Sequence, residues 1–139
     1  MALKIHPALG TIVICDFAGL REPEITKRRL AVVISPHIRI RPNLCTVIPF
    51  STTAPPIARD YHCTIQIDPP LPKPYDSPLQ WVKGDLLYTV SLARLGLPFD
   101  GKTDGSRNYD IRILTDAELT RVRKCMLHGL GLAQLTHHL

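Results

Sequence analysis

The sequence predicts a mainly β fold, a small barrel or strongly curved sheet, with one helix at the C-terminal end. Short β-branched runs recur along the first two thirds of the chain, separated by segments rich in Gly and Pro. One helical pattern follows them. Strands do not alternate with helices, which argues against a doubly wound parallel sheet. A length of 139 residues suits one domain, so we expect a single unit over 1–139.

The predicted strands are β-branched or alternating runs that end near glycine or proline. They cover 11–17, 30–35, 44–50, 62–67 and 80–92, the last in one or two pieces broken near Gly84. The run 30–35, LAVVIS, is almost continuously apolar, which is typical of a strand buried on both faces. In the third run, Pro49 lacks a backbone donor and therefore indicates an edge, a bulge or a strand end.

Two segments interrupt this pattern and are predicted to be inserted loops, 68–80 and 97–110. The first is expected to be extended and stiff, because five prolines lie between positions 68 and 78. The helix is predicted over 115–130, since Thr115 and Glu118 have the spacing of a capping box. The apolar residues of its inner face are Leu119, Val122 and Met126.

The net charge of +5 is concentrated in one stretch of the chain. Between Leu20 and Pro42 lie six basic and two acidic residues. Such a stretch is either an ordinary solvated loop or a cationic surface that attracts phosphates. Composition alone leaves both interpretations open.

The cysteines and the hydropathy pattern exclude several other classes of protein. The four cysteines form no CxxC pair and are not clustered with histidines, so we expect reduced, buried thiols, no metal site and no cofactor. No apolar run approaches the roughly 18 residues that a membrane span needs, and the N-terminal residues lack an apolar signal core. These observations predict a cytoplasmic protein with no membrane partner.

Three motifs resemble those of one known family. They are GTIVICDF at 10–17, RRLAVVIS at 28–35 and VIPFSTT at 47–53, with a weaker fourth, WVKGD, at 81–85. In this order and spacing they resemble the PemK/MazF family of type II toxin–antitoxin toxins, endoribonucleases also called mRNA interferases. The resemblance implies an SH3-like barrel, a homodimer and a cognate protein antitoxin. It also implies metal-independent cleavage of single-stranded RNA by 2′-OH attack, giving a 2′,3′-cyclic phosphate or 3′-phosphate and a 5′-OH.

Arg29 is the first catalytic candidate that the resemblance implies. It begins an apolar strand, so its guanidinium is expected at the barrel rim, where it can hold a phosphate and stabilise transition-state charge. Ser51 aligns with the family's active-site hydroxyl. Glu24 matches an acidic family position and can act as a base or orient Arg29. Asp85 matches another, with a role in proton transfer or in contact with a base edge.

The RNA-binding candidates are basic or hydroxyl-bearing residues near these positions. They are Lys27, Arg28, Arg39, Arg41, Thr52 and Lys83. Arg39 and Arg41 alternate with isoleucines, so one side of that stretch can follow an RNA backbone. Trp81 and Tyr88 can stack bases, although a core or dimer contact suits them better.

Two other functions remain open at this point. CcdB-type proteins share the implied fold and bind DNA gyrase instead of cutting RNA. Arg29 together with Ser51 argues against that function, because a gyrase poison needs neither. The second alternative is an RNA-binding barrel without catalysis. Ser51 also suits an ordinary turn, Glu24 a solvated loop, and His37 and His62 are further bases outside the motifs.

Overall fold

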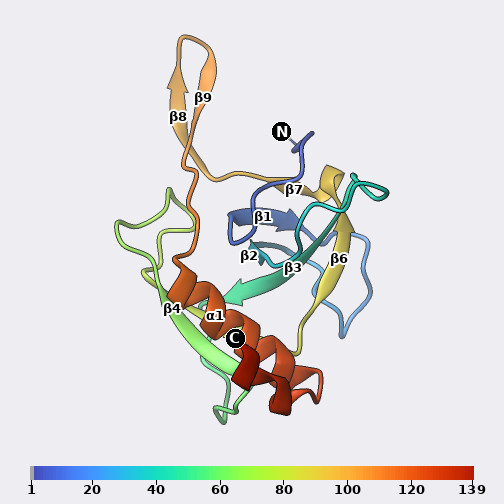
Figure 1. Cartoon of the computed structure of the whole chain (residues 1–139). Helices are drawn as coiled ribbons and strands as arrows, with labels where there is room; N and C mark the ends of the chain where they lie inside the picture. Colours follow the sequence, from blue (N-terminus) through green and yellow to red (C-terminus); the bar gives the residue numbers. More distant parts are fainter. Residues whose placement is uncertain (1) are drawn as a thin grey trace.

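The computed structural model describes residues 2–139 and consists of a curved antiparallel sheet with one long helix packed on it (Figure 1). The strands of the sheet are β1 (Ile12–Asp16), β2 (Arg28–Val33), β3 (Leu44–Ser51), β4 (His62–Gln66), β5 (Leu79–Lys83), β6 (Tyr88–Ser91) and β7 (Leu95–Gly96). The remaining elements are the hairpin strands β8 (Phe99–Thr103) and β9 (Ser106–Tyr109), the helix α1 (Asp116–Gly129) and the 3-10 turns η1 (Leu92–Arg94) and η2 (Ala133–His138). The predicted class, mainly β with a C-terminal helix, is confirmed.

The sheet strands pair in the order β4-β5-β3-β2-β1-β7, and β6 also pairs with β3. Strand β3 therefore changes its neighbour along its length. It pairs with β6 as far as Val47 and with β5 from Phe50 onward. Pro49 lies between these two partners, opposite Ala31 of β2. A proline costs least at such a point, because no neighbour there requires its missing N–H. Strand β3 continues to Ser51. Of the three alternatives that Pro49 indicated, the strand end is therefore wrong.

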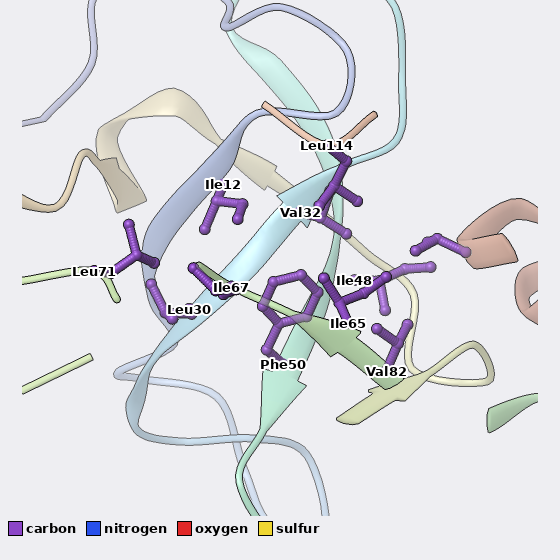
Figure 2. Close-up of a cluster of buried hydrophobic side chains, with 11 residues drawn as sticks. Ile12, Leu30, Val32, Ile48, Phe50, Ile65, Ile67, Leu71, Val82 and Leu114 are labelled. Carbon is purple, nitrogen blue, oxygen red and sulfur yellow. The ribbon is translucent and has the colours of Figure 1, made fainter. Parts of the chain in front are cut away.

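The central strands separate two apolar clusters. Along β2, Leu30 and Val32 belong to one cluster, while Ala31 and Val33 belong to the other. Side chains alternate along a strand, so a continuous apolar run fills both faces at once, as the sequence predicted. Figure 2 shows the first cluster, whose further members come from β1, β3, β4 and β5 and from the segments around them.

The helix α1 begins with the predicted capping box. The Glu118 N–H donates to Thr115 Oγ1 at 3.2 Å, and the Thr115 N–H donates to Glu118 Oε1 at 2.9 Å. The buried residues of the helix are Leu119, Val122 and Cys125, with Met126 partly buried beside them. Within residues 2–139, no helix has both the length and the apolar character needed to cross a membrane.

Two glycines let the helix lie directly against the sheet. A Cβ atom built on Gly84 would come within 2.3 Å of the Cys125 carbonyl, and one built on Gly129 within 2.7 Å of the Asp85 nitrogen. Real Cβ atoms essentially never come within 3.0 Å of another residue's heavy atoms, so any side chain at either position would displace backbone. The break that the sequence predicted near Gly84 is therefore the place where α1 crosses the end of β5.

The segment predicted as a loop over 97–110 forms instead a β-hairpin that projects from the body of the protein (Figure 1). Thr103 lies opposite Ser106, so Asp104 and Gly105 form a two-residue turn. Both have positive φ, 52° and 79°, as a type I′ hairpin turn requires. The sequence pair Asp-Gly is a standard signal for such a turn, and it was missed because the flanking residues are polar.

Candidate functional site

A cavity of about 110 Å³ opens where β2 begins. Its polar lining residues are Arg28, Arg29, Thr52, Tyr75, Ser77 and Gln80. The apolar floor includes Leu30 and Phe50, which belong to the first cluster. The sheet therefore brings two arginines, a threonine and a tyrosine to the border of one small space.

The register of β2 and β3 relates Arg29 to Ser51. The last pair in this ladder is Ala31 with Pro49. Two residues further on, the same register would place Arg29 opposite Ser51 and on the same face, because side chains alternate. Beyond Ala31 the strands are no longer paired, and Ser51 pairs with Trp81 of β5 instead. The two predicted catalytic residues thus share one face of the sheet, at the place where the ladder opens. Leu30 and Phe50, which floor the cavity, belong to the opposite face, so Arg29 borders the cavity at the strand end.

The hydroxyl groups at the end of β3 differ in what they contact. The Ser51 hydroxyl accepts a hydrogen bond from the Thr53 N–H at 3.1 Å and donates to the Thr53 carbonyl at 3.4 Å. This is a local turn of the kind that serine often forms. Thr52, which is exposed, lines the cavity with the two arginines, and Ser51 is not among the lining residues. In this structure Thr52, and not Ser51, is therefore the hydroxyl-bearing residue of β3 and its end that borders the cavity.

The two arginines differ in electrostatic surroundings. Arg28 Nη2 lies 3.3 Å from Asp16 Oδ2, in an exposed pair of the kind that contributes little stability. A hydrogen bond from the Ala18 N–H and a second one from Arg28 hold the pKa of Asp16 below its ordinary value. Within residues 2–139, Arg29 has no carboxylate at ion-pair distance. Its charge is therefore available to an anionic ligand.

The loop before β2 holds Glu24 and Lys27, both exposed. Glu24 Oε1 accepts a weak hydrogen bond from the Arg21 N–H at 3.4 Å, which closes a local turn. No hydrogen bond or ion pair among the described residues joins Glu24 to Arg29. The structure therefore brings Lys27 next to the arginine pair along the chain, but it does not connect Glu24 to that pair.

Lys83 and Asp85 lie at the end of β5, away from the lining of the cavity. Lys83 is on the same face as Trp81, two residues before it, and Trp81 is paired with Ser51. Asp85 is exposed, and its backbone packs against Gly129 at the end of α1. Lys83 extends the face that carries Arg29 and Ser51, whereas Asp85 borders the helix.

Arg39 and Arg41 lie in the exposed connection after β2. Lys27, Arg28 and Arg29 lie at the opposite end of the same strand. The strand separates these two basic groups, so the stretch that carries most of the excess charge forms two surfaces and not one. The arginines of the connection are not part of the cavity lining.

Sequence reasoning missed Tyr75 and Gln80. Both line the cavity, and burial raises the pKa of the Tyr75 phenol while nearby Arg28 lowers it. Gln80 is buried and donates from Nε2 to the Ser77 carbonyl at 3.2 Å. The phenol is protonated near neutral pH, so it can donate a hydrogen bond to an anion. The only available signal was that Tyr75 is the single tyrosine of the proline-rich segment. The sequence does not indicate where that segment crosses the sheet.

These groups together define a class of protein, a small mainly β protein with a cationic, hydroxyl-bearing cleft at the rim of its sheet. Guanidinium, hydroxyl and phenol groups bind phosphate oxygens by charge-assisted hydrogen bonds. Within residues 2–139, no three or more His, Cys, Asp or Glu side chains are grouped so that they could hold a metal ion.

Comparison with known proteins identifies the family. Residues 8–126 match the model of the PemK-like, MazF-like toxin of type II toxin–antitoxin systems, and the chain belongs to this family. An uncharacterized protein of Haemophilus influenzae is 33% identical over 118 residues, which is 74% of this chain and 79% of that protein. The YifN protein of Escherichia coli is 31% identical over 114 residues, 68% of this chain and 75% of its own length.

Solved structures support the same fold. An endoribonuclease from a mycobacterial species, in complex with its cognate antitoxin, has a TM-score of 0.61 at 18% identity, over 91% of this chain and 97% of that one. MazF from Deinococcus radiodurans has a TM-score of 0.60 at 19% identity, over 90% and 96% of the two chains. At these identities the likeness establishes a shared fold alone.

Proposed function

We propose that this protein is an endoribonuclease toxin that cleaves single-stranded RNA by attack of a ribose 2′-OH on the adjacent phosphate. The observation that carries the proposal is the cavity at the start of β2, where Arg28, Arg29 and Thr52 meet. The nucleophile belongs to the substrate, so the reaction does not require a metal ion to generate it. The protein must bind the phosphate, stabilise the phosphorane and help to transfer two protons.

In this proposal the tasks fall to the lining residues of the cavity. Arg29 holds the scissile phosphate and stabilises the charge that develops on its oxygens, since no carboxylate of the described residues neutralises it. Thr52 donates to a phosphate oxygen from the same cavity. The phenol of Tyr75, whose pKa is raised by burial, supplies a further donor. The 2′-oxygen bonds to phosphorus as its proton leaves, and the 5′-oxygen departs and gains a proton.

The proposed products are an RNA with a 2′,3′-cyclic phosphate or 3′-phosphate and an RNA with a 5′-OH. Ser51 contributes through the turn that positions Thr52, and Glu24 and Asp85 stay as proposed acidic partners in proton transfer. Lys27, Lys83, Arg39 and Arg41 bind the RNA backbone outside the cavity. We also propose a homodimer and a cognate protein antitoxin. The antitoxin is supported by one structural neighbour, which was solved in complex with its own.

The decisive experiment compares purified wild type with Arg29→Ala on a long mixed RNA in EDTA. We expect cleavage by the wild type, 5′-OH ends, and a loss in kcat of about 10²–10³ in the variant, as for removal of one oxyanion donor. Arg123→Ala is the control, because it removes an equal charge from α1, outside the cavity. Binding of RNA without any cleavage would overturn the proposal in favour of an RNA-binding domain.

The hydroxyl assignment has its own test. Thr52→Val removes the hydroxyl that lines the cavity and keeps the shape of the side chain, whereas Ser51→Ala removes only the turn hydroxyl. We expect Thr52→Val to lower kcat more than Ser51→Ala does. The reverse order would show that Ser51 turns into the cavity when RNA binds, as the family alignment implies.

A further inference from the structure

A second cavity, of about 160 Å³, lies beside the first and shares Arg28 with it. It opens between the sheet edge and the base of the β8–β9 hairpin. The charged and aromatic residues that line it are Arg28, Arg94, Arg107, Asp16 and Phe99. Three arginines thus line a cavity with one carboxylate, and Arg28 is common to this cavity and the proposed cleavage cavity.

The arginines of this cavity are held in place. Arg94 Nη1 donates to the Asp16 carbonyl at 2.9 Å and to the Ala18 carbonyl at 2.7 Å, which fixes its guanidinium against the turn after β1. The guanidinium carbon of Arg107 lies 4.2 Å from the centre of the Phe99 ring. A planar guanidinium that lies over an aromatic ring leaves its N–H groups free for hydrogen bonds.

The β8–β9 hairpin exposes two aromatic side chains to solvent. Phe99 and Tyr109 lie opposite each other in the strand pair, with ring centres 6.2 Å apart, and each remains more than a third exposed. A two-stranded hairpin alone is marginally stable in water, and a bound ligand would stabilise it. Neighbouring exposed apolar groups often mark a binding site, and the two rings at the base of the hairpin are of this kind. The hairpin also carries Asp100 and Asp104, and neither lines the cavity.

We propose that the base of the hairpin and the cleft beside it form a second RNA subsite, outside the bond that is cleaved. Arg28 and Arg94 bind a backbone phosphate, and the stacked Phe99 and Arg107 provide a platform for one unpaired base. Bases of single-stranded RNA stack on aromatic rings and on guanidinium planes. The proposal rests on the proposed function, because continuity with the cleavage cavity through Arg28 is what favours RNA over an acidic peptide.

Binding of RNAs that cannot be cleaved tests the subsite separately from catalysis. Fluorescence anisotropy measures the affinity for 2′-O-methyl oligouridines of about 6 and about 16 nucleotides, which span common single-strand site sizes. We expect Phe99→Ala and Arg107→Ala to bind the longer RNA about tenfold more weakly and the shorter RNA as the wild type does. Phe99→Trp keeps a stacking ring and should keep the affinity. Arg123→Ala, on α1, is the charge-matched control.

Salt dependence separates a phosphate contact from a structural effect. Loss of the Arg94 contact, in Arg94→Gln, should reduce the slope of log K against log salt by about 0.7, the value for one phosphate of a single strand. Equal affinities of wild type and hairpin variants for the longer RNA would overturn the proposal. So would an equal loss on both RNAs, or a loss of affinity for the cognate antitoxin alone. A wild type that binds the longer RNA better but cleaves nothing would refute the proposed function and leave the subsite standing.

Discussion

The contact between α1 and the sheet gives the sharpest test of the fold, through the substitution Gly84→Ala. The added Cβ would lie 2.3 Å from the carbonyl carbon and oxygen of Cys125 and 2.6 Å from the nitrogen of Met126. These are backbone atoms, so no side chain can rotate away. Gly84 does not have a left-handed φ, and the predicted cost is therefore purely steric.

The magnitude follows from how far the helix must move. Ordinary contact begins at 3.4 Å, so the helix backbone must retreat by about 1.1 Å. A gap of 0.5–1 Å already forfeits roughly a quarter to a half of a van der Waals contact, and Leu119 and Val122 move with the helix. Overpacking costs about 1–3 kcal/mol, while alanine gains about 0.4–1 kcal/mol through the unfolded chain. We expect a net loss of about 1–2 kcal/mol.

Urea denaturation measures this loss. Trp81 is the only tryptophan and lies three residues from Gly84, so its fluorescence reports on the same region. Gly105→Ala is the control, because Gly105 has φ 79° and nothing within 4 Å, so its cost of about 1–2 kcal/mol is conformational. Circular dichroism follows the same transitions independently.

A double-mutant cycle then tests the cause. Gly129→Ala creates a clash with Asp85 and Gly84 from the other side of the same crossing. One displacement of the helix relieves both clashes, so the double variant should cost clearly less than the sum of the two single variants. A Gly84→Ala protein within 0.5 kcal/mol of the wild type, or strictly additive costs, would refute the packing argument.

Three further predictions concern single groups. Thr115→Ala removes the helix cap and should cost about 1 kcal/mol in urea denaturation, while Thr115→Ser should recover most of it; equal stabilities would contradict the role of the cap. Asp16 has a lowered pKa, so its stabilising effect is complete above its ordinary pKa of 3.8 and is lost as pH falls through the lower folded value. Asp16→Asn should therefore be less stable than wild type at pH 6, with a difference that shrinks at pH 3, and a difference independent of pH would exclude this linkage. Burial raises the pKa of Cys15 to about 12, whereas a hydrogen bond from Cys125 lowers that of Cys63. Iodoacetamide at pH 8, followed by mass spectrometry, should modify Cys63 well before Cys15, and the opposite order would contradict the burial of Cys15.

The strand pattern was readable from sequence because both faces of the sheet are buried. The run that starts at Leu30 places four buried residues in succession and so fills two apolar clusters at once. The helix was readable from its cap at Thr115 and from its apolar spacing. Pro49 was harder to place, because a proline is tolerated wherever no neighbour needs its N–H. Only the topology shows that β3 changes partners at that residue.

The site was predictable only as far as its residues lie on regular strands. Arg29 begins β2, as the apolar run after it predicted, and the register then relates it to Ser51. Tyr75 reaches the cavity from a proline-rich connection, and prolines constrain the stiffness of a chain without specifying its direction.

The inserted β8–β9 hairpin is ordered by different interactions from those of the core. The sheet and helix satisfy their own hydrophobic faces without it, so nothing in the core pattern required 97–110 to be ordered. Its order comes from the Asp104–Gly105 turn and from the Phe99–Tyr109 pair, which are local features. Arg107 stacks on Phe99 and lines the cavity that Arg28 shares. In the proposed subsite, an insertion stabilised by its own turn and ring pair would therefore change which RNAs bind without any change in the fold.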